Sequence, residues 1–450
     1  MGNSLTLDMW QGAEQEFASG SIPMELFEAL GDTGVFVFKP DDGIPRAFLR
    51  NGGLCYIHSN LFEVCTPECR NPFEVVAYDK ACEAYARLAS WTYEEETGRR
   101  IHFYKTNIAL DPKGVVPYTT VGSHENYLVE RSSYIENQQL LVPYMILRQV
   151  FVGAGGYVNG RYLLSPRTMF PKALFSETST DYPILSTRDE SHTEEHYARA
   201  HIVNGEGARS EYTTFLKHSV TSYVLRAIEE GYLSWVPEID QPLESNKEIA
   251  LNLGGDWTVP LKNGETIGVT DYLNTYYLGQ VEELFSDNST SDEDRLALRE
   301  FKWVLGKLDD GLIESLDGSI EWVIKKSLAE NVHDYQFEAE FNEETARIAL
   351  LNQYMAVTDP LYDELVEEEK IRTIVSEEAV ENAFLEAPTM SRGALRVKLA
   401  KEFKDSIKTM SWAYLKLKPS IRYEPFEFND LGGWTDEKVQ KMVDMIGSVL

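Results

Sequence analysis

Two glutamates separated by one residue, Glu14 and Glu16, are the first side chains in the sequence whose types and spacing could do chemistry. They lie in the segment 12–17, which we predict to be a strand, and alternate residues of a strand point to the same face. Two carboxylates on one face offer hard oxygen donors for a magnesium ion. A strand edge that faces solvent would show the same spacing, so the pair alone leaves both interpretations open.

A second segment, residues 51–68, is also predicted to contain a strand with side chains of catalytic type. Leu54, Tyr56 and His58 share one face under the two-residue period of a strand, and Glu63 follows them. Other expected strands supply further polar groups, namely Lys105, Asn107, His124, Glu125 and Asn126. Their number favours a metal site on a sheet, although a hydrogen-bonded structural role for His124 is an equal alternative.

Glycine-rich phosphate loops of the familiar kinds do not occur in the sequence. Neither Gly-x-x-x-x-Gly-Lys nor Gly-x-Gly-x-x-Gly is present. The run 153–156 is rich in glycine, but it follows a helical segment, and we predict a tight loop there.

Four cysteines fall in one short stretch around His58: Cys55, Cys65, Cys69 and Cys82. Their spacing raises a zinc site and a disulfide as alternatives. An odd separation on a strand, however, sends Cys55 and His58 to opposite faces. We therefore predict reduced cysteines that pack in the core.

The composition limits the classes of partner. The chain has 450 residues, and its 42 basic and 73 acidic residues give a formal net charge of −31. This charge repels phosphate backbones, so we predict no nucleic-acid partner, and it serves solubility or steers a basic substrate surface. No apolar run reaches the ~20 residues of a membrane helix. Because residues 1–10 also lack a signal-peptide pattern, we predict a cytoplasmic protein without membrane contact.

The hydrophobic pattern predicts an α+β fold. Short apolar or alternating runs predict strands at 34–38, 46–50, 54–59 and 101–107. A helix is predicted to begin after the cap Asn71, with Pro72 in its first turn, and to run to Ser90. Further helices are predicted at 211–230, 270–285, 293–308, 320–329 and 343–356. We place a boundary near Glu368, between a large catalytic domain, 1–368, and a small C-terminal α/β domain, 369–450.

Taken together, these segments resemble the family of Pup ligases and depupylases. That family has the glutamine synthetase-type fold, in which helices pack around a twisted, mainly antiparallel sheet. The matching segments follow one another in order through nearly the whole chain: 12–17, 51–52, 63–68, 79–81, 122–128, 153–155, 187–190, 199–201, 210–217, 320–325 and 412–417.

The resemblance implies a carboxylate-amine ligase that depends on ATP and Mg²⁺. Enzymes of the family convert a carboxylate, the side chain of the C-terminal glutamate of Pup, into an acyl phosphate, which a lysine amine attacks. By resemblance, Glu16 and His58 are the catalytic residues and His201 is a further member of the site. The implied magnesium ligands are Glu14, Tyr56, Glu63 and His124. The implied nucleotide contacts are Thr66, Arg188, Arg199 and Trp412.

Two positions depart from the family pattern. Leu54 stands where the family has an arginine that reaches the nucleotide, so Arg188 or Arg199 would have to compensate. His58 stands where the family has an aspartate that acts on the attacking amine in ligases and assists amide cleavage in depupylases. An imidazole can accept a proton near neutral pH, but it excludes an acyl-aspartate pathway.

Loop lengths give mixed indications about the branch of the family. About thirty residues separate Glu16 from Arg46, as in Pup ligases, whereas the five-residue step from His58 to Glu63 matches depupylases. Our leading hypothesis is a ligase that joins a Pup-like or ubiquitin-like modifier, a peptide or a small molecule to an amine such as a protein lysine. The alternatives are a depupylase-like amidase and a non-catalytic nucleotide-binding paralogue.

Overall fold

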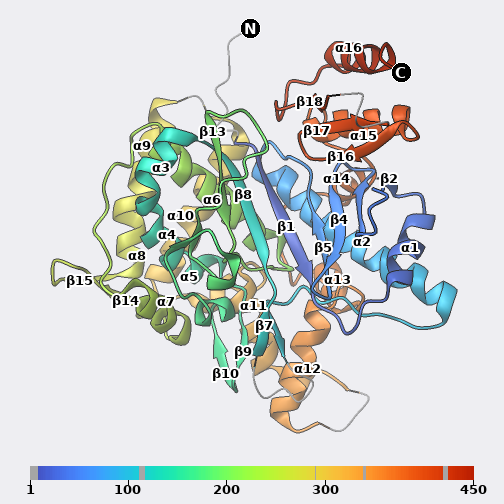
Figure 1. The fold of residues 1–450 in the computed structure, drawn as a ribbon. Coiled ribbons are helices and arrows are strands. Elements are labelled where there is room, and N and C mark those ends of the chain that lie inside the picture. Colours follow the sequence, from blue (N-terminus) through green and yellow to red (C-terminus); the bar gives the residue numbers. More distant parts are fainter. Residues whose placement is uncertain (1–8, 111–116, 289, 338–340, 419–423) are drawn as a thin grey trace.

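A sheet of nine strands runs through the computed structural model, which describes residues 9–110, 117–288, 290–337, 341–418 and 424–450 (Figure 1). The strand order is β11-β12-β13-β8-β1-β5-β4-β3-β2. Every pairing in this sheet is antiparallel except that of β11 with β12. The strands of the sheet are β1 (Gln11–Phe17), β2 (Phe36–Phe38), β3 (Arg46–Leu49), β4 (Leu54–His58), β5 (Leu61–Cys65), β8 (Ser123–Glu130), β11 (Phe175–Ser176), β12 (Leu185–Ser186) and β13 (Tyr197–Ile202).

Short hairpins and a small sheet complete the β structure. The hairpins are β6 (Ile108–Leu110) with β7 (Pro117–Thr120), β9 (Gly156–Val158) with β10 (Arg161–Leu163), and β14 (Thr258–Pro260) with β15 (Thr266–Gly268). The small sheet is C-terminal and contains β16 (Ile407–Met410), β17 (Tyr414–Leu417) and β18 (Phe426–Glu427).

Helices pack against the sheet and against one another, with α2 against β1 and β5 and α6 against β8. Among the described residues, no helix is long and apolar enough to cross a membrane. The helices are α1 (Met24–Asp32), α2 (Pro72–Thr97), α3 (Arg131–Asn137), α4 (Leu141–Leu147), α5 (Gln149–Val152), α6 (Glu211–Glu229), α7 (Pro242–Leu251), α8 (Val269–Tyr272), α9 (Gly279–Asp287), α10 (Asp292–Asp309), α11 (Glu321–Glu330), α12 (Glu343–Met355), α13 (Leu361–Glu367), α14 (Glu377–Leu385), α15 (Arg392–Phe403) and α16 (Asp436–Gly447).

Side-chain alternation gives the sheet an apolar face and a polar face. Along β1, Ala13, Gln15 and Phe17 are buried, while Glu14 and Glu16 on the opposite face are only half-buried. Phe17 belongs to a hydrophobic core that also contains side chains of β4, β5 and α2. One face of the central strands therefore packs on α2, which leaves the other face available for polar side chains.

Most of the predicted elements are confirmed. The helix predicted from Asn71 is α2, whose N-terminus is capped by the Asn71 side chain and which continues beyond Ser90 to Thr97. The other predicted helices correspond to α6, α10, α11 and α12, and to the run α8–α9, which includes a π-helical segment at Leu273–Leu278. The predicted strands at 34–38, 46–50 and 54–59 are β2, β3 and β4.

The predicted strand at 101–107 is wrong. This segment runs between two different partners instead of lying in one ladder: Tyr104 forms an isolated bridge with Ala18 and another with Ala356. The next residue, Lys105, donates its backbone N–H to the carbonyl of Met355. An alternating sequence cannot reveal that its backbone bonds are divided between two distant segments.

The four cysteines are free and buried, which confirms the prediction of packing cysteines. Cys55 and Cys82 lie in the core between the sheet and α2. Burial raises the pKa of the Cys82 thiol well above its ordinary value, so it stays protonated at neutral pH.

The C-terminal elements gather next to β2 and β3 at one end of the molecule, drawn in red in Figure 1. Their hydrophobic core combines side chains of α15, β16, β17 and α16 with Val37, Phe38 and Phe48 of the sheet. In contrast, α14 packs along α2. The domain boundary near Glu368 stays a prediction.

A half-buried carboxylate, Glu68, holds these C-terminal elements to the segment that follows β5. Arg396 makes a two-pronged ion pair with Glu68, at 2.6 and 2.8 Å, and Arg392 donates to the same carboxylate at 2.8 Å. Arg396 also donates to the carbonyls of Gly52 and Trp412, at 2.8 and 3.0 Å. We call Glu68, Arg392 and Arg396 the Glu68 clamp.

Replacing Glu68 by glutamine should loosen the C-terminal elements. The change leaves two buried guanidinium groups without their carboxylate, and breaking a buried ion pair in this way costs roughly 3–5 kcal/mol. Hydrogen exchange should therefore lose protection first in α15, β16 and β17. The matched control is Glu28→Gln, which removes the exposed pair with Lys39 and should change little. Unchanged protection of α15 in the Glu68 variant would refute the clamp.

Acid should release the same elements. Burial alone would raise the pKa of Glu68, but the charges of Arg396 and Arg392 lower it from 4.5 to about 2. The clamp therefore contributes its full stability above pH 4.5 and loses it as the pH falls toward 2. Fluorescence of Trp412 should follow this loss in the wild type, and in Glu68→Gln it should show no such transition.

Candidate active site

Polar side chains on five adjacent strands share the face of the sheet that is turned away from α2. Glu14 lies opposite His124 of β8, and Glu16 lies opposite Glu63 of β5, which in turn lies opposite Tyr56 of β4. Directly paired residues of antiparallel strands point to the same side. Residues from distant parts of the sequence are thus brought into one polar row: Arg199, His201, His124, Asn126, Glu14, Glu16, Glu63, Tyr56 and His58.

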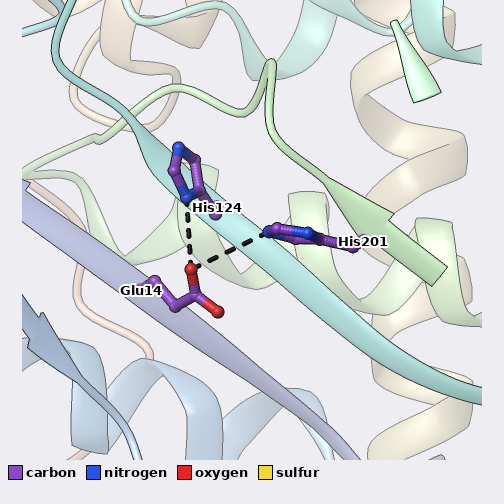
Figure 2. Close-up of side chains that lie close together, drawn as sticks. All are labelled: Glu14, His124 and His201. Carbon is purple, nitrogen blue, oxygen red and sulfur yellow. Dashed lines mark hydrogen bonds and ion pairs between the residues drawn. The ribbon is translucent and has the colours of Figure 1, made fainter. Parts of the chain in front are cut away.

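Glu14 lies beside His124 and His201 at one end of this row (Figure 2). His124 Nδ1 is 3.2 Å from its Oε2, and His201 Nε2 is 3.8 Å from the same oxygen. The other oxygen, Oε1, accepts hydrogen bonds from Asn126 at 3.1 Å and from Arg199 at 3.4 Å. Both carboxylate oxygens are therefore surrounded by donors or imidazole nitrogens.

These neighbours fix the protonation states. Burial would raise the pKa of Glu14, but the hydrogen bond from His124 and the charge of Arg199 hold it well below its ordinary value. Burial and the charge of Arg199 lower the pKa of His201 to about 3, despite the attraction of Glu14. At neutral pH His201 is consequently a neutral imidazole beside a carboxylate.

Glu63 has the opposite environment. Burial, and then repulsion from the carboxylate of Glu14, raise its pKa to about 8, and Glu16 adds to this shift. Tyr56, hydrogen-bonded to Glu63, also has a raised pKa because of burial and the neighbouring Cys65 and Glu63. The middle of the row thus concentrates acidic groups and is short of positive charge.

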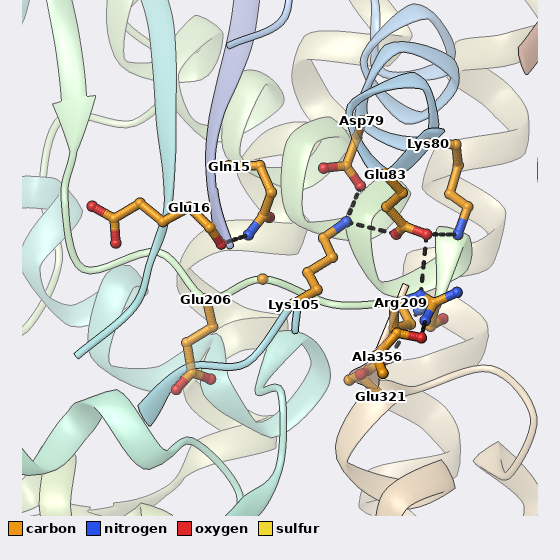
Figure 3. Close-up of polar contacts among 12 residues, drawn as sticks. Gln15, Glu16, Asp79, Lys80, Glu83, Lys105, Glu206, Arg209, Glu321 and Ala356 are labelled. Atoms are coloured by element: carbon orange, nitrogen blue, oxygen red, sulfur yellow. Dashed lines mark hydrogen bonds and ion pairs between the residues drawn. The ribbon is translucent and has the colours of Figure 1, made fainter. Parts of the chain in front are cut away.

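Some of the polar residues singled out in the sequence lie away from this face. Lys105 is buried next to α2, where its Nζ binds Asp79 at 2.5 Å and Glu83 at 3.1 Å (Figure 3). Arg209 binds Glu83 from the other side, at 3.1 Å. Asn107 binds the backbone of Gly207 through both its amide oxygen and its amide nitrogen. These side chains hold the scaffold together and do not extend the polar row.

Glu125 points in the opposite direction from His124 along β8. Its carboxylate makes an ion pair with Arg148 at 2.6 Å, and both side chains are buried. Burial would raise the pKa of Glu125, but Arg148 lowers it to about 2. Glu125 is therefore a structural carboxylate behind the sheet.

A pocket with a cavity volume of about 110 Å³ opens at the Glu14 end of the polar row, smaller than the ~300–1,000 Å³ typical of small-molecule sites. Its wall comes from the sheet, from the loop before β13 and from the C-terminal elements. The residues that line it are Trp10, Gln11, Gly12, Ala13, Glu14, Cys65, Thr66, Pro67, Glu68, Asn126, Tyr127, Leu128, Ser191, His192, Arg199, Arg392, Trp412 and Leu431. The pocket therefore has apolar walls of aromatic and aliphatic groups and a polar region around Glu14.

Three of the four predicted nucleotide contacts, Thr66, Arg199 and Trp412, line this pocket, whereas Arg188 does not. Arg188 is exposed and pairs with Glu190 at 2.6 Å. Arg392 and His192 also line the pocket, although the sequence pattern predicted neither of them as a site residue. Arg392 reaches the pocket through the Glu68 clamp and donates to the backbone carbonyl of His192. Their separation along the chain leaves no local motif that could have revealed them.

His58 lies at the far end of the row, where it is exposed just before a tight hairpin turn. The two turn residues, Ser59 and Asn60, have φ values of 50° and 63°, as hairpin turns of the primed type require. Asn60 accepts a hydrogen bond from Ile22 N–H at 2.9 Å and donates to the carbonyl of Gly20 at 2.7 Å. The strand end that carries His58 is therefore fixed while its ring remains open to solvent.

Leu54 is the other position that departs from the family pattern. Its side chain packs against the hydrophobic core of the C-terminal elements, as Trp412 does. It lies opposite Cys65, next to the strand end that lines the pocket. An apolar side chain at this position strengthens the contact with the C-terminal core and supplies no charge to the pocket.

The chain is similar to known proteins along most of its length. The family model described as Pup-ligase protein matches residues 12–416. The chain is 30% identical over 419 residues to a Pup–protein ligase of Jonesia denitrificans, covering 89% of each protein. It is also 30% identical over 388 residues to a depupylase of Acidothermus cellulolyticus, covering 83% of this chain and 75% of the depupylase.

A solved structure has the same fold. The crystal structure of the complex between the prokaryotic ubiquitin-like protein Pup and its ligase PafA superposes with a TM-score of 0.81 at 23% identity, covering 99% of this chain and 96% of the other. The predicted α+β architecture, with helices packed around a mainly antiparallel sheet, is thereby confirmed. From the family model and the identity to these relatives, we conclude that the chain belongs to the Pup-ligase family.

Proposed function

We propose that this chain uses ATP to join a side-chain carboxylate of a Pup-like modifier to a lysine amine of a protein. Membership of the Pup-ligase family confirms the predicted class of enzyme, a ligase that forms C–N bonds. The observation that carries the proposal is the continuity of the site. A pocket with aromatic walls ends at Glu14 and Arg199, and a row of acidic groups leads from there to His58.

The resemblance to the family implies the reaction, and the layout of the site would accommodate it. ATP would bind with its base against Trp412 and its phosphates toward Arg199 and Glu14. An oxygen of the donor carboxylate attacks the γ-phosphorus, ADP leaves, and an acyl phosphate results. The amine nitrogen then attacks the acyl carbon, phosphate departs, and the amine loses a proton. His58, at the open end of the row, is the residue proposed to accept that proton.

Tyr56 and Glu63, two of the predicted magnesium ligands, would fit a magnesium ion together with Glu16, which the resemblance implies as a catalytic residue. They supply oxygen atoms only, which is the donor set that Mg²⁺ prefers. Burial and repulsion from Glu14 raise the pKa of Glu63, and among the described residues its carboxylate makes no ion pair with a lysine or arginine. Glu14 and His124 extend this group toward the pocket. Magnesium bound there would neutralise charge on the transferring phosphoryl group. We propose the cytoplasm, which supplies ATP, as the location.

An amidase is the second candidate, because one relative at 30% identity is a depupylase. His58 argues against an acyl-aspartate route at this position. Hydrolysis assisted by an imidazole base remains compatible with the same site. A preformed conjugate distinguishes the two activities. The amidase should hydrolyse it without consuming ATP in proportion to the bonds cleaved, whereas the ligase should consume ATP in proportion to the bonds it forms.

The proposed role of His58 as the base can be tested by two substitutions. His58→Ala should abolish ligation, because the amine loses its base, whereas His58→Asp should retain part of it, because a carboxylate also accepts a proton. The measurement is ADP release together with conjugate formation in the presence of Pup, a lysine-containing acceptor and Mg²⁺. The matched control is His333→Ala, which removes another exposed histidine. Full activity of His58→Ala would rule out the base assignment.

Magnesium binding should release a proton through Glu63. With a pKa of about 8, this carboxyl is mostly protonated at pH 7 in the metal-free protein, and a bound cation favours the ionised form. Calorimetry in buffers of different ionisation enthalpy should therefore detect proton release at pH 7 and much less at pH 9. Glu63→Gln should reduce the release at pH 7. If the variant releases as many protons as the wild type, Glu63 does not bind the ion.

A further inference from the structure

The strands of the nine-stranded sheet carry little positive charge. Among the described residues, these strands contain no lysine and just two arginines, Arg199 on β13 and Arg46 on β3. In the strand order, β13 and β3 lie on opposite sides of β1 (Figure 1). Arg199 supports Glu14 at the pocket end of the polar row, so Arg46 belongs to the other end.

Strand pairing places Arg46 on the polar face of the sheet. Arg46 lies directly opposite Tyr56 of β4, and directly paired residues point to the same side. Its neighbour Ala47 belongs to the hydrophobic core that packs on α2, which agrees with this alternation. His58, two residues beyond Tyr56 on the same face, is a diagonal neighbour of Arg46. Arg46 thus extends the polar row by one strand at its open end.

The guanidinium of Arg46 is held at one edge and available at another. Nη2 donates to Asp42 at 2.5 Å, and Asp42 is itself fixed by the backbone N–H of Ile44 at 3.1 Å. Nε has no hydrogen-bond partner among the described residues, and the side chain is 39% exposed. An exposed pair of this kind contributes little to stability, so a second carboxylate can share the arginine at small cost. The planar fork of arginine donors matches a carboxylate in two-pronged geometry.

The position of Arg46 relative to the acidic groups determines which part of a donor it can meet. Arg46, Tyr56 and Glu63 are aligned on three neighbouring strands, and strands are ~4.8 Å apart, so the Cα atoms of Arg46 and Glu63 are about 10 Å apart. In the proposed reaction, the nucleotide occupies the Arg199 end and the donor carboxylate reacts in the middle of the row. Arg46 therefore lies beside the reacting group and meets a neighbouring group of the same donor.

We propose that Arg46 binds a second carboxylate of the donor, the α-carboxylate of a C-terminal acidic residue whose side chain reacts. Arg46 then acts as a specificity residue that selects donors by their free carboxyl terminus. A local cation is needed for this task, because a net charge of −31 repels an anionic donor from the molecule as a whole. This inference rests on the proposed function, and it names the chemical group by which the donor is recognised.

The test uses two synthetic peptides that end in glutamate and differ only in the terminal group, which is a carboxylate in one and a carboxamide in the other. In the wild type, the carboxamide should raise the KM of the donor roughly tenfold or more, because a hydrogen bond to a charged group contributes a factor of that size. The kcat should change little, because Arg46 does not touch the reacting carboxylate. Fluorescence anisotropy of the labelled peptides, with ADP and Mg²⁺ present, should show the same difference in Kd.

Arg46→Gln should remove this preference. Its KM and Kd for the carboxylate peptide should rise to the values of the carboxamide peptide, whose own values should not change. Arg46→Lys keeps the charge but loses the two-pronged geometry, so it should retain part of the preference. The matched control is Arg295→Gln on α10, which removes another exposed arginine paired with a nearby aspartate and should behave as the wild type.

Three results would overturn the inference. They are equal binding of both peptides by the wild type, binding of neither, and a wild-type preference that persists in Arg46→Gln. Because anisotropy requires no turnover, the two proposals can fail separately. A wild type that binds the carboxylate peptide selectively but forms no conjugate would contradict the ligase reaction and leave the role of Arg46 in binding supported.

Discussion

Side-chain alternation along β1 connects the hydrophobic core and the candidate active site through a single strand. Phe17 and Ala13 are directed into the packed side of the sheet, and Glu14 and Glu16 are directed out of it. A shift of one residue in the pairing of β1 would bury both carboxylates and expose the phenylalanine. The burial that stabilises the sheet therefore also fixes where the acidic groups stand. The positions of the side chains on the polar face thus depend on the packing of the apolar face.

Positive charge is distributed unevenly around this face. Behind the sheet, Lys105 and Arg148 are paired with buried carboxylates. On the polar face, Arg199 supports Glu14, but the carboxyl of Glu63 has no comparable cation, and its pKa is raised to about 8. Leaving the acidic groups without such a partner is consistent with a surface that receives metal ions and phosphate.

The pocket depends on parts of the chain that lie far from its central strands in the sequence. Arg392 belongs to α15, yet it lines the pocket and binds the backbone of His192. Trp412 lies next to β17 and is also part of the wall. Because the Glu68 clamp attaches these elements to the segment that follows β5, the pocket is complete only when the C-terminal elements are docked. Binding of a ligand in this pocket and docking of the C-terminal elements are therefore linked processes.

The sequence by itself determined the strands and helices whose periodicity is regular, such as β1, β4 and α2, because alternation and capping act between neighbours in the chain. It also determined that Glu14 and Glu16 share a face, and the matching segments identified the family. Only the tertiary structure decided that residues 101–107 bridge two distant segments and that Arg392 reaches the pocket. It likewise decided that His201 meets Glu14 while Arg188 stays outside. These outcomes depend on strand order and on contacts between residues far apart in sequence, and a local pattern carries no information about either.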